Sequence, residues 1–434
     1  MISLLAAVVL TTSPASSIPS GVYQSRGYGW VLDRRVSPSR LYQTAGSACW
    51  LDAGAEPDAV FRHTTQRPDG ALAVTSDAEP QATAYVFDAV ADLPPQCQEA
   101  SADASRAVRA IADLMSERYP GFDARRVDFD ARRHAILDRL PDTASPEAAF
   151  AAAETLLGGL DDAHIALSAD LEGGGRSLAV SQGETLDAIH ARPGDRPERV
   201  WLGAWRSGVE DTILGGQGHV AANNRIFWGL RDGVGYLAIV TMGGFDPDDA
   251  ETLAPLDEAL DAAMTAFAHA RAVVVDVSNN RGGYDAASLK IAGRFAEAPR
   301  LAYLKHGWGS GEPYQPIVVE PSDRPGYHGP VWLLTSDITV SAGETFSQMM
   351  RVLPNVTHAG TATRGAFSDQ TSVTLPNGWS FAMPMEAYVD PEGRALEGHG
   401  LQPRIPLALY PAGDPDRGHA RAVSALITRL SRTR

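Results

Sequence analysis

Short alternating runs of apolar and polar residues fill the first hundred positions of the chain. Residues 27–33 and 83–88, rich in glycine and aromatic side chains, are two examples of this period-two pattern. Strands that have one face on a core and one in solvent show this alternation. We therefore expect a small β-rich domain over residues 18–98.

From about residue 100 the apolar positions recur three and four residues apart, the spacing of one helix face. Three such segments, residues 104–119, 128–140 and 146–157, are separated by breaks that contain proline and aspartate. This pattern predicts a helical bundle over residues 99–168.

Beyond residue 234 apolar strands and amphipathic helices alternate. Apolar runs at residues 235–240, 272–276 and 331–334 are each followed by a segment with helical spacing. Such alternation indicates a layered sheet built from βαβ units. We expect an α/β domain over residues 169–412 and a terminal surface helix over residues 413–434.

The composition is that of an acidic globular protein. Of its 434 residues 44% are hydrophobic and 21% are charged, and the formal net charge is −16. Nucleic acids and anionic membrane surfaces attract basic proteins, so neither is an expected partner. The two cysteines suit no metal site in number or spacing, and no cofactor is expected. Nothing in the sequence indicates an oligomeric state.

The first 17 residues combine a short apolar run with a stretch of small residues. The apolar run is too short to cross a bilayer, which needs about 20 residues, and the small side chains suit a signal peptidase. We expect a signal peptide over residues 1–17 and an exported protein, periplasmic or extracellular, without a membrane span. In that compartment Cys49 and Cys97 would form a disulfide that contributes roughly 4 kcal/mol if unstrained. Without export they would be two buried thiols.

The most informative stretch runs from an apolar strand into a helical pattern at Ser341. The serine and Glu344, three residues later, are spaced as in a capping box. A serine at such a junction is presented as a nucleophile, and the N–H of Ala342, at the helix N-terminus, can stabilise an oxyanion. The competing interpretation is that Ser341 only caps the helix.

Three further segments carry groups that suit such a nucleophile. A buried strand runs into a turn with Gly282 and Gly283, where backbone N–H groups can approach a ligand closely. His164 follows two acidic residues and offers a base, although a lone histidine is more often structural. Glu397 lies in a turn with His399, where it can orient a base or simply be solvated.

In this order and spacing the four segments resemble the serine peptidase family of C-terminal processing proteases and the tricorn core protease. The resemblance covers about residues 100–410 and rests on a D-D-x-H segment, a D-x-x-x-N-x-G-G turn, a T-x-S-A-x-E elbow and an E-G-x-G-x-x-P tail. It implies an α/β sandwich similar to the crotonase and ClpP folds, with Ser341 as the nucleophile. The oxyanion donors that it implies are the N–H of Ala342 and that of Gly282 or Gly283.

Two catalytic arrangements occur in this family, and the sequence favours one. The processing-protease branch takes a lysine base from a G-K-G-x-x-Q segment after the nucleophile. This chain has Ala366 at the lysine position, and its only lysines, Lys290 and Lys305, precede Ser341. A recognisable PDZ module is also missing between the helical and sheet segments.

The tricorn-like branch matches better. It takes a histidine base from the D-x-H segment and orients it with a glutamate near the tail, positions that His164 and Glu397 hold here. The serine that precedes this histidine in tricorn is Ala163 here, so that helper is absent or supplied elsewhere. We therefore expect a serine-type peptidase, an endopeptidase or a carboxy-terminal processing enzyme, that acts on a peptide or protein. His164 would take the proton of Ser341 and later protonate the leaving amine.

Three other interpretations remain open. The elbow also loosely resembles the G-x-S-x-G motif of α/β-hydrolases, in which case an esterase would use Ser341, Asp369 and His399. Ala163 and the missing lysine are compatible with a peptide-binding protein that has lost catalysis. A crotonase-type acyl-CoA enzyme, which uses oxyanion loops without a serine nucleophile, is the third.

Overall fold

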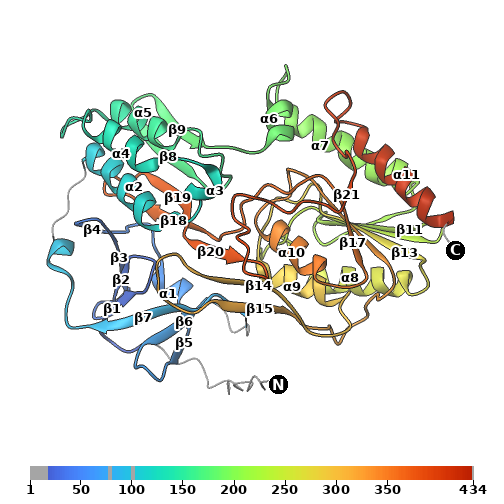
Figure 1. Ribbon diagram of the computed structural model, residues 1–434, viewed down its shortest axis with the longest axis horizontal. Coiled ribbons are helices and arrows are strands. Elements are labelled where there is room, and N and C mark those ends of the chain that lie inside the picture. Colours follow the sequence, from blue (N-terminus) through green and yellow to red (C-terminus); the bar gives the residue numbers. More distant parts are fainter. Residues whose placement is uncertain (1–17, 77–80, 99–102, 433–434) are drawn as a thin grey trace.

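The computed structural model describes residues 18–76, 81–98 and 103–432, so the expected signal peptide lies outside the described residues. Figure 1 shows two lobes. One combines the N-terminal sheet with the helices of residues 104–157, and the other is a layered α/β structure that ends in the C-terminal helix. In the described part of the chain, no helix is long and apolar enough to cross a membrane.

The N-terminal sheet is antiparallel, with seven strands in the order β4-β3-β2-β1-β7-β6-β5. The strands are β1 (Val22–Ser25), β2 (Trp30–Asp33), β3 (Arg40–Ala45), β4 (Ala48–Leu51), β5 (His63–Gln66), β6 (Leu72–Thr75) and β7 (Tyr85–Val90). Buried and partly exposed side chains alternate along β6, as expected for a sheet with one face on a core. Helix α1 (Pro57–Val60) joins β4 to β5, and a disulfide links Cys49 on β4 to Cys97 in the 3-10 helix η1 (Pro95–Gln98).

Four helices follow this sheet: α2 (Ala104–Arg118), α3 (Phe122–Arg125), α4 (Phe129–Leu137) and α5 (Pro146–Leu157). Capping side chains fix the start of three of them. Asp103, Asp128 and Ser145 accept hydrogen bonds from backbone N–H groups in the first turns of α2, α4 and α5. The apolar stripe that predicted α2, for example Val108 and Ile111, is fully buried.

These helices pack on a sheet that the sequence pattern did not indicate. Its order is β18-β19-β8-β9, and it joins β8 (Ala166–Leu171) and β9 (Gly174–Ala179) to β18 (Gln370–Thr374) and β19 (Ser380–Pro384), which come from far along the chain. Because β19 is antiparallel to both β18 and β8, the latter two run in the same direction. The segments that precede them, which contain His164 and Ser368, therefore lie at the same end of the sheet.

The second lobe is built on a seven-stranded sheet in the order β10-β11-β12-β13-β16-β17-β21. Its strands are β10 (His219–Ala221), β11 (Ile226–Arg231), β12 (Val234–Ile239), β13 (Ala272–Asp276), β16 (Val331–Thr335), β17 (Val356–Gly360) and β21 (Ile405–Pro406). The pairs from β12 to β21 are parallel, which explains why β12 and β13 are buried along their whole length and are apolar except for Asp276 at the end of β13. The expected α/β fold class is confirmed.

Helices cover both faces of this sheet. Helices α8 (Ala254–Phe267), α9 (Asp285–Gly293) and α10 (Ala342–Arg351) share a core with Leu237 and Val275. Helix α7 (Pro197–Ser207), the π-helical turn η2 (Gly208–Ile213) and α11 (Gly418–Arg432) share another core with Tyr236 and Val274. Successive strand residues thus point to opposite faces, as the pleat requires.

A three-stranded sheet, β15-β14-β20, lies between the α/β part and the N-terminal sheet. It consists of β14 (Arg300–Gly307), β15 (Gln315–Val319) and β20 (Glu386–Val389), all antiparallel. Helix α6 (Glu184–His190) lies across the gap between the two lobes from α5 in Figure 1.

Candidate active site

Ser341 occupies a strained junction just before α10. Its backbone angles are φ 58° and ψ −127°, a conformation that costs a non-glycine residue free energy and recurs at functional sites. The side chain makes no capping hydrogen bond, so the interpretation of Ser341 as a simple helix cap is wrong. Its N–H donates to the carbonyl of Ala366 at 2.9 Å, which ties the junction to a neighbouring loop.

The glycine-rich turn lies directly against this serine. A Cβ on Gly282 would lie 2.7 Å from the Cβ of Ser341 and 3.2 Å from its Oγ, and φ is +84°, so only glycine fits. The N–H of Gly282 is already used, because it donates to Oδ1 of Asn280 at 2.9 Å. In the described part of the chain the N–H groups of Gly283 and Ala342 have no hydrogen-bond partner. These two are therefore the donors available beside Ser341.

Two buried carboxylates bind four consecutive N–H groups in residues 365–368, which we call the 365–368 loop. Glu344 on α10 accepts from Gly365 and Ala366, both at 2.7 Å. Glu397 accepts from Phe367 at 2.9 Å and from Ser368 at 2.8 Å. Glu344 therefore anchors this loop and does not close a capping box with Ser341.

Both carboxylates have raised pKa values. Burial raises the pKa of Glu344 to about 7, against the hydrogen bonds that it accepts. Burial, with the negative charge of Asp162, raises the pKa of Glu397 to about 8, although Arg125 works in the opposite direction.

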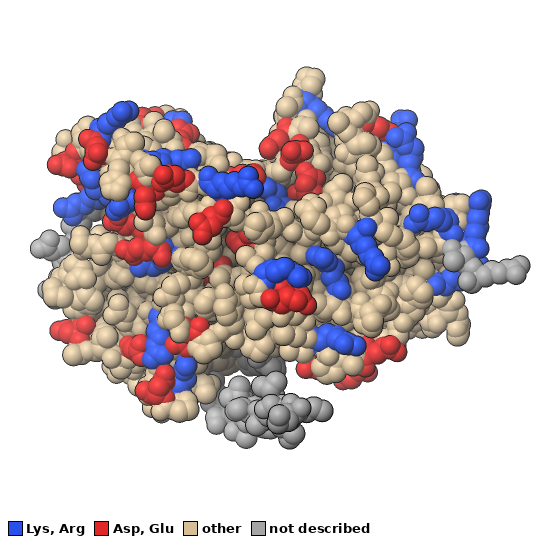
Figure 2. Space-filling view, viewed as in Figure 1, with Lys and Arg blue, Asp and Glu red and all other residues tan. Residues whose placement is uncertain are grey.

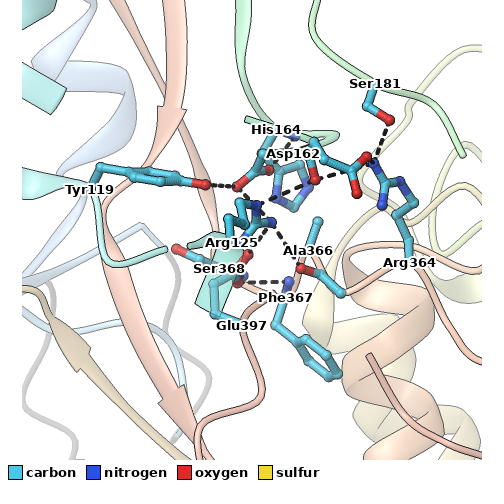
Figure 3. Close-up of polar contacts among 12 residues, drawn as sticks. Tyr119, Arg125, Asp162, His164, Ser181, Arg364, Ala366, Phe367, Ser368 and Glu397 are labelled. Atoms are coloured by element: carbon cyan, nitrogen blue, oxygen red, sulfur yellow. Dashed lines mark hydrogen bonds and ion pairs between the residues drawn. The ribbon is translucent and has the colours of Figure 1, made fainter. Parts of the chain in front are cut away.

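His164 lies just before β8, buried beside the end of the 365–368 loop (Figure 3). Its backbone N–H donates to Oδ1 of Asp162, and its backbone carbonyl accepts from Nε2 of Gln370, both at 2.9 Å. Burial lowers the pKa of its imidazole, which the charges of Asp162 and Asp369 and a hydrogen bond with the backbone of Ser368 partly oppose. The Nδ1 atom is buried and has no hydrogen-bond partner in the described part of the chain.

An arginine that the sequence did not single out joins the acidic groups of the site (Figure 3). Nη2 of Arg125, on α3, lies 2.8 Å from Oδ2 of Asp162 and 3.3 Å from Oε1 of Glu397. The hydroxyl of Tyr119 donates to the same Asp162 oxygen at 2.7 Å. Asp162 lies in the D-D-x-H segment, but nothing local in the sequence distinguishes Arg125 or Tyr119 from ordinary helix residues.

The structure brings Ser341, His164 and Glu397 to one region, but they contact the same loop and not one another. Ser341 and His164 both contact the segment of residues 365–370, and Glu397 binds it. Among the described residues, no hydrogen bond joins His164 to Ser341 or to Glu397. The carboxylate of Glu397 instead faces backbone N–H groups and Arg125.

The alternative α/β-hydrolase triad is not assembled. Asp369 pairs with Lys305 at 3.0 Å, and His399 is exposed, with no side-chain hydrogen bond among the described residues. The lysines are also engaged elsewhere. Lys290 pairs with Asp257 on α8, and the buried Lys305 donates to Asp369.

Comparisons with known proteins agree with this geometry. A putative peptidase from Parabacteroides merdae matches with 24% sequence identity and a TM-score of 0.61, over 76% of this chain and 97% of that one. Mature CPAF complexed with lactacystin matches with 14% identity and a TM-score of 0.53, over 76% of this chain and 98% of that one. These likenesses show the fold. A comparison with curated proteins gives no match.

Residues 233–407 match the model of peptidase family S41. This match supports, for the α/β part of the chain, the family that the motifs led us to expect. The match of the α/β part to a family of serine peptidases supports a serine-type peptidase.

Proposed function

We propose that the chain hydrolyses peptide bonds through an acyl-enzyme formed on Ser341. The observation that carries this proposal is the strained conformation of Ser341, whose hydroxyl caps no helix and faces the Gly282 turn. Such strain is maintained only where the surrounding structure enforces it, as at catalytic residues. The N–H bond to Ala366 and the close approach of Gly282 supply that enforcement.

The oxyanion of the tetrahedral intermediate would be bound by the N–H groups of Ala342 and Gly283. Ala342 opens α10, so its N–H is one of the orphan donors at a helix N-terminus. Gly283 is favoured over Gly282 because the N–H of Gly282 is occupied by Asn280. Preorganised donors of this kind lower the barrier by roughly 3–4 kcal/mol each in serine peptidases.

His164 would act as the general base and then as the acid for the leaving amine. Its lowered pKa keeps the imidazole neutral, and hence able to accept a proton, at neutral pH. Hydrogen bonds between base and nucleophile are often absent without substrate and form in the substrate complex. Glu397 would orient His164 indirectly, through Ser368, whose N–H it binds and whose backbone contacts the imidazole.

The substrate would approach through the hollow between the two lobes, visible in Figure 2. A cavity of about 580 Å³ lies there, lined by residues that include Asp337, Thr363 and Arg364, which flank the Ser341 junction and the 365–368 loop. The proposed substrate is a peptide or protein. An exported location also remains a proposal, which the Cys49–Cys97 disulfide supports because such bonds persist in oxidising compartments.

A fluorophosphonate probe, followed by mass spectrometry, tests the nucleophile. We expect labelling of Ser341 in the wild type and none in Ser341→Ala, together with hydrolysis of a peptide library by the wild type alone. Ser177→Ala is the matched control, because this serine on β9 is exposed and its hydroxyl shares a hydrogen bond with that of Ser168, outside the site. A wild type that binds peptides but resists the probe would favour the non-catalytic interpretation, and labelling of Ser341→Ala would reject Ser341.

His164→Ala tests the base. We expect the rate of Ser341 labelling to fall by about 10³-fold, because an unactivated serine hydroxyl is a weak nucleophile at neutral pH. Lys290→Met, on the surface of α9, is expected to label at the wild-type rate. Full labelling of His164→Ala would exclude His164 as the base.

A further inference from the structure

Lys305 is a buried cation at the junction of three parts of the fold. It lies on β14, is 3% exposed, and its Nζ contacts Oγ1 of Thr83 at 2.5 Å, Oδ2 of Asp369 at 3.0 Å and the hydroxyl of Tyr388 at 3.1 Å. A carboxylate oxygen of Glu386 lies 3.5 Å away. We call these five residues, with Tyr28, the Lys305 cluster.

The ammonium group of Lys305 stays charged in this environment. Burial works to lower its pKa, but the charges of Asp369 and Glu386 outweigh it and raise the pKa above the ordinary value. Asp369 responds in the opposite sense: burial works to raise its pKa, but the charge and hydrogen bond of Lys305 hold it below the ordinary range. The two form an ion pair, with the lysine inside and Asp369 about half exposed.

The Lys305 cluster is attached directly to the active site. Asp369 is the residue after Ser368, so its carboxylate holds the end of the 365–368 loop. Glu386 binds the same end of the loop, because its backbone N–H donates to Oγ of Ser368 at 3.0 Å. That loop in turn binds the N–H of Ser341 and contacts the imidazole of His164.

The N-terminal domain completes the cluster. The hydroxyl of Tyr28 donates to Oε1 of Glu386 at 2.7 Å, and Thr83, which precedes β7, accepts from Lys305. Both residues come from the β-rich domain, outside the segment that matches the family model. This domain therefore contributes polar groups to the support of the 365–368 loop.

We infer that Lys305 is a positioning residue: its ammonium anchors Asp369, and through it the loop that holds Ser341 and His164, and the N-terminal domain completes this anchor through Thr83. The catalytic consequence rests on the proposed function, whereas the anchoring of the loop does not. A misplacement of about 1 Å at a site of this kind costs roughly 100-fold in rate.

The test compares Lys305→Met, which removes the charge but keeps the chain length, with Lys305→Arg, which keeps the charge. A cavity of about 260 Å³, lined by Tyr28, Thr83, Lys305 and Glu386, gives the larger guanidinium room. The matched control is the same change at the other lysine, Lys290→Met on α9, whose ammonium pairs with Asp257 and not with this loop. Thr83→Val tests the contribution of the N-terminal domain with a change of similar volume.

Two readouts separate positioning from folding. In Lys305→Met we expect kcat for a peptide substrate to fall by about 100-fold with KM within roughly threefold, and Lys305→Arg to restore most of it. Hydrogen exchange of a peptide spanning residues 364–370 should accelerate in Lys305→Met and, less, in Thr83→Val, and stay at the wild-type rate in Lys290→Met. Exchange in β13 should not change in any variant.

The outcomes distinguish this inference from the proposed function. Unchanged exchange at residues 364–370 in both Lys305→Met and Thr83→Val would overturn the anchor, whatever the activity. Exchange that accelerates while kcat is unchanged would overturn the positioning role alone. A wild type without peptidase activity would reject the proposed function, and the exchange experiment would still decide whether Lys305 anchors the loop.

Discussion

The N–H of Ser341 donates a hydrogen bond to the carbonyl of Ala366, with an N···O distance of 2.9 Å. Ala366 stands where the lysine-dependent branch of the family has its base. In this chain the backbone of that residue supports Ser341, and its side chain is fully buried. Glu344 accepts the N–H of Ala366, and Glu397 accepts the N–H of the next residue, Phe367. A displacement of either carboxylate would therefore move Ala366, and with it the hydrogen bond to Ser341.

Gly282→Ala should disable Ser341 by direct contact. The new Cβ would lie 2.7 Å from the Cβ of Ser341, a separation that requires one of the two to move. We expect fluorophosphonate labelling to fall by about 100-fold, since displacement of a nucleophile by about 1 Å costs that much. The matched control is Gly70→Ala, where φ is also left-handed, at +89°, but nothing lies within 4 Å of the added methyl. Equal labelling of the two variants would contradict a close approach of Gly282 to Ser341.

Arg125→Met should destabilise the fold strongly, because it leaves the buried carboxylate of Asp162 without its cation. The side chains of Arg125, Asp162 and Glu397 are at most 5% exposed. Loss of one partner from a buried ion pair costs about 3–5 kcal/mol. Arg394→Met is the control: its side chain is 72% exposed and pairs with Asp390 at the surface, so we expect a loss of no more than about 1 kcal/mol. Urea unfolding of both variants measures the difference, and similar losses would show that Arg125 contributes no more than a surface arginine.

The local parts of the site were predictable because their signals are local. The apolar run before Ser341 predicts a buried strand from its own composition. Gly282 and Gly283 predict a turn with positive φ angles, which glycine adopts without strain. The helical segment expected after the apolar run of residues 235–240 begins only at Ala254, the first residue of α8. Side chains of Asp246 and Asp249 accept backbone N–H bonds two residues later, which form turns that compete with the helix.

The supporting contacts were not predictable because they join distant segments. The proximity of His164 to the 365–368 loop depends on β8 pairing with β19, and no single-sequence pattern shows which strands pair. Lys305 looked irrelevant as a base, and its contacts with Thr83 and Asp369 appear only once three sheets have assembled. Arg125 lies on a four-residue helix without a motif.

The stability of the fold should decrease as pH rises from about 7 to 8. The pKa of Glu397 is raised to about 8 and that of Glu344 to about 7, so the folded state binds more protons there than the unfolded chain does. The stability from such groups is fully present below the unfolded pKa, near 4.5, and is lost as pH rises through the folded pKa. We expect the melting temperature to fall over this range. The buried His164 and His358 have lowered pKa values, which act in the opposite direction only in more acidic solution.

Glu397→Gln should make that fall in melting temperature shallower. One oxygen of Glu397 accepts both loop N–H bonds, so a carboxamide oxygen can retain them while the titrating group is removed. Glu392→Gln is the matched control, because Glu392 is 62% exposed and pairs with Arg394 at the surface. Calorimetric scans across the pH range measure both slopes, and a slope in Glu397→Gln as steep as in the wild type would show that Glu397 is not a source of this dependence.

Asp369→Asn should shift the acid limb of kcat/KM to lower pH. This limb reports protonation of the free base, and burial places the pKa of His164 below its ordinary value of 6.5. The charged groups that act on the imidazole are Asp162 and Asp369, which raise its pKa, and Arg125, which lowers it. Removing the charge of Asp369 therefore lowers the pKa further, so His164 stays neutral into more acidic solution.

The profile of kcat/KM against pH for a peptide substrate measures this shift. Asp170→Asn, an exposed change on β8 outside the site, should leave the limb in place. A limb that moves to higher pH in Asp369→Asn, or moves equally in Asp170→Asn, would mean that the titrating base is not the imidazole beside Asp369. A limb that moves to lower pH only in Asp369→Asn would assign it to His164, because the charge of Asp369 raises the pKa of that imidazole.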